Sequence, residues 1–166
     1  MWNCQSLEKS LTVYNIKVIN KTHSPEVLFL CETKNNSSTV ECVLRRCGFN
    51  SMFTVEPIGM AGGYVIAWKA EIIMQIVEHD SFFIYFKMED RQGKMKWEVI
   101  GVYLHTEEGI RAGQFNRVLE VLKRRGESII VMGDYNAIRS NHEKEGGRIT
   151  TATSIQKFND FINFGV

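Results

Sequence analysis

Two polar side chains directly follow an apolar run in Ile129-Ile130-Val131-Met132-Gly133-Asp134-Tyr135-Asn136. The run is short and continuous, which predicts a strand buried on both faces. Asp134 and Asn136 stand two residues apart, so an extended chain would point both side chains to the same face. A turn is the alternative interpretation, because Asp and Asn also begin many loops. We expect the pair to enter a functional site at the carboxyl end of a buried strand.

The composition is that of one globular domain covering residues 1–166, with 44% hydrophobic and 23% charged residues. The net charge is +1, so affinity for nucleic acid would have to come from a local basic patch. The longest apolar runs, such as 27–31, are too short to span a bilayer. The first five residues lack the basic start and apolar stretch of a secretory signal. We therefore expect an intracellular protein, nuclear or cytoplasmic, that makes no membrane contact.

The four cysteines carry no pattern of metal or disulfide chemistry. Cys4, Cys31, Cys42 and Cys47 include no CxxC pair, and no histidine stands at zinc-ligand spacing from them. We expect all four to be reduced thiols in or near the core.

Hydrophobic spacing predicts strands and helices along the whole chain. The expected strands are 2–4, 27–31, 51–56, 63–68, 72–77, 82–88, 96–105 and 128–133, with a hairpin turn at 90–93. The expected helices contain apolar residues at helical spacing within 11–19, 40–47, 115–122 and 155–162. A polar loop is expected over 134–148. Buried strands covered by helices predict an α/β fold, a sandwich of two face-to-face sheets with helices outside, and the alternative is a single mixed α/β sheet.

Polar residues follow the expected strands in a definite order. The segments are Trp2-Asn3-Cys4, Cys31-Glu32-Thr33, Gly101-Val102-Tyr103 and Gly133-Asp134-Tyr135-Asn136. This order resembles the endonuclease/exonuclease/phosphatase superfamily, which has the DNase I-like αββα sandwich. Three further segments are similar, more narrowly, to the endonuclease domain of plant non-LTR (LINE-type) retrotransposons. They are Pro25 to Lys34, Gly62-Gly63 leading to Ala67-Trp68, and Glu143 to Arg148.

The resemblance implies hydrolysis of DNA phosphodiesters with Mg²⁺ as cofactor and Mn²⁺ as the alternative. It implies that Glu32 is the metal ligand and that Asn3 lies beside it to orient metal or phosphate. Asp134 would orient or deprotonate the attacking water, and Asn136 would hold the scissile phosphate. Tyr103 would donate its hydroxyl to a phosphate oxygen. Mg²⁺ prefers oxygen ligands and is usually held by only one or two carboxylates, which agrees with a single acidic ligand.

Three basic residues are expected to contact the backbone of a DNA partner. Lys34 follows the metal-ligand segment, and Lys144 and Arg148 lie in the loop after Asp134. Contacts of this kind give affinity that depends on salt and tolerates changes of sequence.

The sequence departs from the family at its C-terminal side. Members of the family continue through more strands to a Ser-Asp-His motif, and nothing after Gly147 resembles it. An aspartate that usually precedes that motif is also missing, and the first strand begins late. We therefore expect an incomplete domain with an open sheet edge and with weakened or lost activity. His105, on the face of the strand that carries Tyr103, and His142 are candidates to replace the missing histidine.

Two other functions remain open at this stage. The chain can be a non-catalytic remnant or a nucleic-acid-binding module, in which the fold persists without cleavage. It can also be a phosphatase of the same superfamily that acts on a small or lipid phosphate. The segment from Glu143 to Arg148 favours nucleic acid over the phosphatase. The sequence leaves the oligomeric state open.

Overall fold

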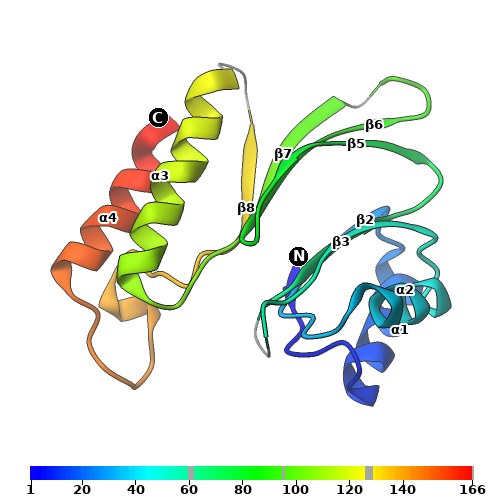
Figure 1. Cartoon of the computed structure of the whole chain (residues 1–166), viewed down its shortest axis with the longest axis horizontal. Coiled ribbons are helices and arrows are strands. Elements are labelled where there is room, and N and C mark those ends of the chain that lie inside the picture. The colour runs from blue at the N-terminus through cyan, green and yellow to red at the C-terminus, as the bar shows by residue number, and fades with distance from the viewer. Residues whose placement is uncertain (60–61, 95, 126–128, 166) are drawn as a thin grey trace.

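The computed structural model of the chain describes residues 1–59, 62–94, 96–125 and 129–165. Its strands form two sheets that pack face to face, with helices on both outer sides (Figure 1). The first sheet has the order β1-β2-β4-β3 and contains β1 (Trp2–Asn3), β2 (Val27–Cys31), β3 (Ser51–Val55) and β4 (Tyr64–Trp68). The second has the order β5-β6-β7-β8 and contains β5 (Ile72–His79), β6 (Phe83–Asp90), β7 (Lys96–Tyr103) and β8 (Ile130–Asp134). The two-sheet αββα prediction is confirmed, and the single-sheet alternative is wrong.

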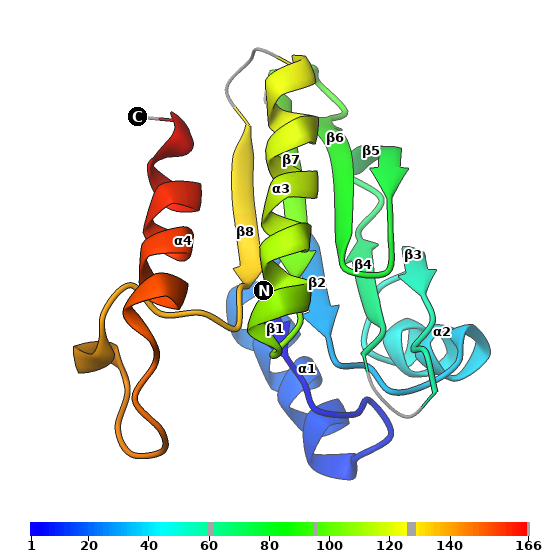
Figure 2. The ribbon, with the colours of Figure 1, turned by 60° about the vertical axis from the view of Figure 1, so that its left-hand side comes forward.

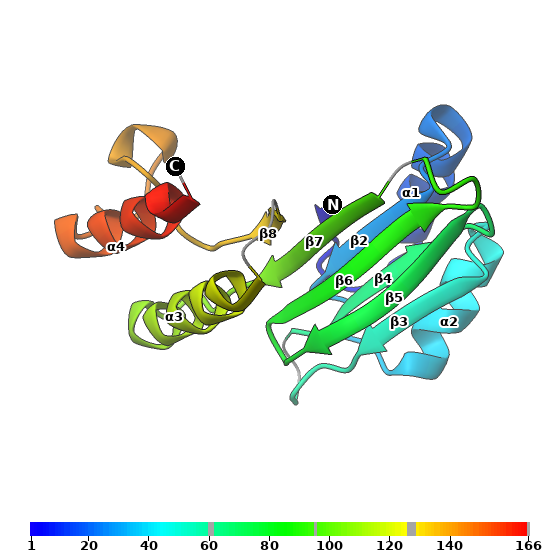
Figure 3. The same ribbon diagram turned by 90° about the horizontal axis from the view of Figure 1, so that it is seen from above.

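The helices cover opposite faces of the sandwich. The main helices are α1 (Ser10–His23), α2 (Ser37–Arg46), α3 (Glu108–Arg125) and α4 (Ala152–Ile162), and short 3₁₀ turns span Asn141–Glu143 and Asn163–Gly165. α1 and α2 lie on the outer face of the first sheet, whereas α3 and α4 lie on the side of the second (Figure 3). No helix in these parts of the chain combines the length and hydrophobicity needed to cross a bilayer.

Three apolar layers hold the sandwich together. The layer under α1 and α2 includes Ile16, Leu28, Leu30, Val40, Leu44, Phe49 and Val65. The layer between the sheets consists of Phe29, Cys31, Tyr64, Ile66, Ile84, Phe86 and Val99. The layer under α3 and α4 includes Phe83, Tyr85, Ile100, Val102, Phe115, Val118, Phe158 and Phe161. Successive residues of a central strand therefore enter different layers, which is why these strands are continuous apolar runs.

Two parallel strand pairs bring the expected site residues to one end of the sandwich. β1 pairs in parallel with β2, and Asn3 lies opposite Cys31. β7 pairs in parallel with β8, and Tyr103 lies opposite Asp134. Because parallel strands end at the same edge of a sheet, each sheet presents polar residues from two strand ends. Figure 2 shows these ends of β1, β2, β7 and β8 close to one another near the N-terminus.

Helix α1 forms as expected but buries a different face. Leu11, Tyr14 and Val18, which indicated the helix, are exposed by 66%, 63% and 41%. Thr12 and Ile16 are the buried residues of this helix. The hydroxyl of Thr12 donates a hydrogen bond to the carbonyl of Cys4, so a polar residue faces inward. Apolar residues occur on both sides of α1, and hydrophobic spacing alone could not identify the buried one.

The strand after the hairpin is shorter than predicted. β7 ends at Tyr103, and the backbone amide of His105 donates instead to the Gln114 side chain at 2.7 Å. The expectation that His105 shares a strand face with Tyr103 is therefore wrong. Ser128, the first residue expected in the last strand, lies outside the described residues.

Three of the four cysteines match the expectation of buried thiols. Cys4, Cys31 and Cys47 are buried and free, whereas Cys42 is exposed, contrary to the expectation for it. Cys42 lies two positions after the buried Val40, on the outward side of α2. Burial raises the pKa of Cys4 to about 11 and that of Cys31 to about 12, so both thiols stay protonated near neutral pH.

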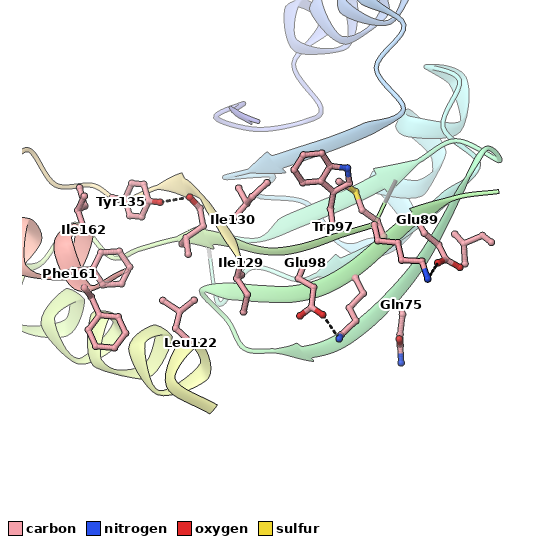
Figure 4. A pocket seen from close by; sticks show the side chains of 16 residues that line it. Gln75, Glu89, Trp97, Glu98, Leu122, Ile129, Ile130, Tyr135, Phe161 and Ile162 are labelled. Carbon is pink, nitrogen blue, oxygen red and sulfur yellow. Dashed lines mark hydrogen bonds and ion pairs between the residues drawn. The ribbon is translucent and has the colours of Figure 1, made fainter. Parts of the chain in front are cut away.

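Strand β8 forms one edge of the second sheet, and a groove of about 1270 Å³ lined by both apolar and charged side chains runs beside it. Figure 4 shows Ile130 of β8 and the preceding Ile129 between Trp97 on one side and Phe161 and Ile162 of α4 on the other. Trp97 is 45% exposed and Ile130 41% exposed. An uncovered strand edge beside exposed apolar side chains favours pairing with other chains.

We expect the protein to self-associate at high concentration and Ile130→Lys to reduce this, because a charge on an edge strand opposes pairing. Light scattering across a concentration series measures the effect. The matched control is Ile149→Lys, because Ile149 is 84% exposed and is not among the residues that line the groove. An equal reduction by both variants would show that surface hydrophobicity in general, and not the β8 edge, drives association.

Glycine is required where β8 approaches β7. A Cβ added at Gly133 would lie 2.0 Å from the carbonyl oxygen of Val102. We expect Gly133→Ala to lower the free energy of unfolding by about 1–3 kcal/mol or more, because β8 must shift to accept the methyl group. Denaturant unfolding measures the loss. Gly113→Ala on α3 is the control, since an added Cβ there meets nothing within 4 Å and alanine favours the helix. A Gly133→Ala protein as stable as wild type would contradict the close approach.

Candidate active site at one end of the sandwich

The side chain of Asn3 joins two carboxylates that come from different sheets. Its Nδ2 donates to Glu32 Oε1 at 3.1 Å and to Asp134 Oδ2 at 2.9 Å. All three side chains are partly buried, so each carboxylate meets an amide donor away from bulk water. Asn3 reaches both because β1 lies at the edge of the first sheet, beside β2. The structure thus brings together three of the predicted site residues.

Glu32 is held by three donors. In addition to Asn3, the hydroxyl of Tyr103 donates to Oε1 at 3.1 Å, and the ammonium of Lys34 lies 3.2 Å from Oε2. Burial alone would raise the pKa of Glu32, but the hydrogen bonds from Asn3, Lys34 and Tyr103 outweigh it and hold the pKa below its ordinary value. Glu32 is therefore a carboxylate at neutral pH.

Tyr103 is a hydrogen-bond donor in this arrangement. Its burial, and then the nearby carboxylate of Glu32, raise the pKa of its phenol well above the ordinary value. The phenol stays protonated, so its role is to donate a hydrogen bond and not to take up a proton.

Asp134 and Asn136 combine both interpretations of the motif, a site and a turn. Asp134 Oδ1 accepts from the backbone amide of Asn136 at 3.0 Å, which is the geometry of an Asx turn. Asn136 has a φ of 46°, so the two side chains do not share an extended face as expected. The side-chain amide of Asn136 turns back and donates to the carbonyl of Leu104 at 2.7 Å. Both residues nevertheless lie at the same pocket.

Backbone strain concentrates at the site. Glu32, Lys34 and Asn136 have φ values of 55°, 54° and 46°, and they make up half of the six non-glycine residues with positive φ in the described chain. This left-handed region is unfavourable for residues with a Cβ. Such outliers gather where surrounding contacts hold side chains in a functional arrangement.

A pocket of about 590 Å³ lies beside Asp134 and Asn136. Thr106, Arg111, Lys144 and Thr150 are among its other lining residues. The structure therefore places Lys144 at this pocket. The ammonium of Lys144 donates to the carbonyl of Arg148 at 2.9 Å, and the Arg148 side chain is exposed.

The two candidate replacement histidines are engaged elsewhere. The Nδ1 atom of His105 accepts a hydrogen bond from the backbone amide of Glu107 at 2.9 Å. His142 is exposed in the 3₁₀ turn Asn141–Glu143. Across the described part of the chain, neither imidazole hydrogen-bonds to Glu32 or Asp134.

Sequence reasoning missed Arg111, which lines the pocket and is only 5% exposed. A signal was present in its spacing. Arg111 precedes Phe115 by four residues and Val118 by seven, so it stands on the apolar face of α3. A charged residue on the buried side of a helix needs polar partners, and this requirement marks it as a candidate.

The residues fit a divalent cation bound through few protein ligands. No cluster of three or more His, Cys, Asp or Glu side chains that could hold a metal occurs among the residues with described positions. Asn3 Oδ1 is buried and has no hydrogen-bond partner, so the residue that contacts Glu32 also carries an unpaired oxygen of the kind that a cation binds. Mg²⁺ suits such a site, because it keeps several waters and needs only one or two carboxylates.

The pKa of Glu32 predicts how this residue affects stability. A depressed folded-state pKa means that ionised Glu32 stabilises the fold above the unfolded value of about 4.3, and that this contribution is lost as pH falls through the folded value. We expect the difference in unfolding free energy between wild type and Glu32→Gln to be largest near neutral pH and to shrink below about pH 4. Denaturant unfolding from pH 7 to pH 3 measures it.

Glu26→Gln is the matched control, since Glu26 is exposed and precedes the strand that Glu32 follows. Its effect should be small and nearly constant over the same pH range. A constant difference for Glu32→Gln as well would mean that the three donors do not stabilise the ionised form.

Comparison with solved structures shows the same fold at low sequence identity. The chain superposes on an AP endonuclease from Archaeoglobus fulgidus with a TM-score of 0.68 and 12% identity, covering 98% of this chain and 68% of that one. A 3′-5′ exonuclease from Neisseria meningitidis superposes with a TM-score of 0.65 and 15% identity, covering 98% of this chain and 69% of that one. The human Nocturnin catalytic domain superposes with a TM-score of 0.60 and 19% identity, covering 82% of this chain and 62% of that one.

The chain thus spans about two-thirds of the length of these structures, between 62% and 69%. A comparison with curated proteins by sequence gives no match. The model of the Endonuclease/Exonuclease/phosphatase family, however, matches residues 2–162, which is nearly the whole chain. The two-sheet fold of the chain and the polar residues at its strand ends agree with this match. The chain belongs to the Endonuclease/Exonuclease/phosphatase family.

Proposed function

We propose that the chain is a DNA endonuclease domain that hydrolyses phosphodiester bonds with Mg²⁺, or alternatively Mn²⁺, as cofactor. The observation that carries this is the Asn3 amide, which holds Glu32 and Asp134 together from two sheets. DNA is supported as the partner by two structures of similar fold. A 3′ phosphatase from Neisseria is bound to a product DNA hairpin, and a zebrafish TDP2 is complexed with a single-stranded DNA product.

Each site residue has a role that its contacts allow. Glu32, kept ionised by its donors, would hold the cation with Asn3 Oδ1, and the cation would supply charge neutralisation at the phosphate. Asp134, held by Asn3 and by the amide of Asn136, would orient or deprotonate water. Tyr103 would donate to a phosphate oxygen, because its phenol stays protonated. Positioned donors of this kind contribute most of the rate in phosphoryl transfer.

Asn136 would hold the scissile phosphate, for which its amide would have to turn from the carbonyl of Leu104 or share it. The basic residues divide into two roles. Lys34 forms an ion pair with Glu32 and would mainly keep that proposed metal ligand ionised. Lys144, at the pocket, and Arg148, exposed in the same loop, would contact the DNA backbone and make binding depend on salt.

We further propose that the domain is of the plant LINE-type retrotransposon class and acts in the nucleus or cytoplasm. Support comes from the segment Pro25 to Lys34, which contains the proposed metal ligand, and from Glu143 to Arg148, of which Lys144 lines the pocket. The 166 residues contain no counterpart of the family's Ser-Asp-His motif. A group of this acid–base or charge-stabilising kind typically contributes about 10²- to 10⁴-fold in rate, so we expect slow cleavage when these 166 residues are tested alone.

Nicking of supercoiled plasmid tests the function. We expect the 166-residue chain to nick slowly with Mg²⁺ and not with EDTA, and Asp134→Ala to lower the rate by about 10²-fold or more, because the water loses its orienting carboxylate. Asp90→Ala is the matched control, since Asp90 lies at the opposite end of β6 and β7 from Tyr103. It should nick like wild type.

Two outcomes would contradict the proposal. Equal nicking by wild type and Asp134→Ala would remove Asp134 from the mechanism. Absence of nicking by folded wild-type protein would mean that the domain does not cleave DNA and is either a nucleic-acid-binding module or a non-catalytic remnant. Salt-dependent retention of plasmid in a gel would then identify the binding module.

A further inference from the structure

The loop between β7 and α3 fixes the side chain of Asn136 by a hydrogen bond. The carbonyl of Leu104 accepts from the Asn136 side chain at 2.7 Å, and the amide of Leu104 donates to the Asp134 carbonyl at 2.9 Å. Two residues at the end of β8 are therefore tied to one residue of this loop. If the loop moves, the side chain of Asn136 loses its fixed direction.

Arg111 of α3 binds this loop through hydrogen bonds to its carbonyl groups. Its Nη1 donates to the carbonyl of His105 at 3.0 Å and to that of Thr106 at 2.7 Å. Its Nη2 donates to the hydroxyl of Ser154 in α4 at 3.2 Å. One side chain thus joins the β7–α3 loop, the first turns of α3 and the start of α4.

The charge of Arg111 is buried without an ion pair, and the carboxylate of Glu108 acts on it only at longer range. Its side chain is 5% exposed, and no carboxylate of the described residues lies within ion-pair distance of it. Burying a cation in this way is costly unless its donors are satisfied, and here two carbonyls and a hydroxyl satisfy three of them. An apolar residue would pack on this stripe of α3 at a lower cost. The position of the guanidinium at the pocket of Asp134 and Asn136 gives a reason for the charge.

We propose that Arg111 is a positioning residue, whose forked contacts with the loop carbonyls fix the anchor of Asn136 and whose charge makes the pocket favourable for a phosphate. The inference rests on the proposed function, because the phosphate is that of the DNA substrate. Arg111 itself does not touch the reacting atoms. It acts through the carbonyls that it holds and through Asn136.

Steady-state nicking by Arg111→Lys tests the positioning role. Lysine keeps the charge but lacks the planar fork that reaches two carbonyls and Ser154 together. We expect kcat to fall about 10- to 100-fold while KM changes less than about twofold, because a misplaced group lowers the rate more than it weakens binding. Arg111→Met, which also loses the charge, should in addition raise KM.

Arg117→Lys is the matched control on the same helix. Arg117 is partly exposed and pairs with Glu78 and Glu120, so this variant loses an arginine fork away from the loop. Its kcat and KM should equal those of wild type. Thermal unfolding must show that each variant is folded at the assay temperature. A folded Arg111→Lys protein with wild-type kcat would overturn the inference.

A second measurement does not depend on cleavage. The side-chain amide of Asn136 gives an NMR signal that Asn136→Ala identifies, and its shift reports the hydrogen bond to Leu104. We expect Arg111→Lys to move or broaden this signal and Arg117→Lys to leave it in place. If wild type cleaves no DNA but the signal moves, the proposed function fails and the positioning role stands. If wild type cleaves DNA and the signal stays in place, the positioning role fails alone.

Discussion

The arrangement at the site depends on one amide placed between two carboxylates. Glu32 and Asp134 arrive from separate sheets, and without a donor between them their charges would repel at a partly buried position. Asn3 donates to both and carries no charge of its own, so it holds the pair without neutralising either acid. A lysine in its place would neutralise part of the negative charge of the pair. The two sheets must therefore keep their spacing at this end, and the apolar layer between them sets it.

Several local costs are concentrated around this amide. Three residues of the site adopt left-handed backbone conformations, and β8 approaches β7 so closely that only glycine fits at position 133. Arg111 is buried, and no ion pair is found for it among the described residues. Each feature is unfavourable by itself and is held by hydrogen bonds to neighbouring loops. Burial of the apolar layers on both sides of each sheet stabilises the fold and offsets these unfavourable local features. Rigidity at the site is thus a property of the whole sandwich.

The sequence predicted the layers better than the details of the site. Continuous apolar strands and turn residues were enough to predict two sheets with helices outside, and the order of polar strand ends selected the residues that Asn3 joins. Local pattern could not show that Leu11 and Tyr14 face solvent, because α1 has apolar residues on both sides. It also missed that Asn136 turns back to Leu104, since a left-handed residue looks like any other in sequence. Arg111 was visible in its spacing, but its partners are backbone carbonyls that no pattern reveals.

The bridge from Asn3 to Asp134 joins residues separated by 131 positions in the chain. Its two ends lie on β1 and β8, which belong to different sheets, so both sheets must be formed at this end before the bridge can close. A chain emerging from the ribosome therefore exposes Glu32 long before Asp134 exists to complete the pair. Partly made or partly folded chains contain only one half of the arrangement. This long-range closure ties formation of the site to the pairing of strands in both sheets, so the site cannot form from either sheet alone.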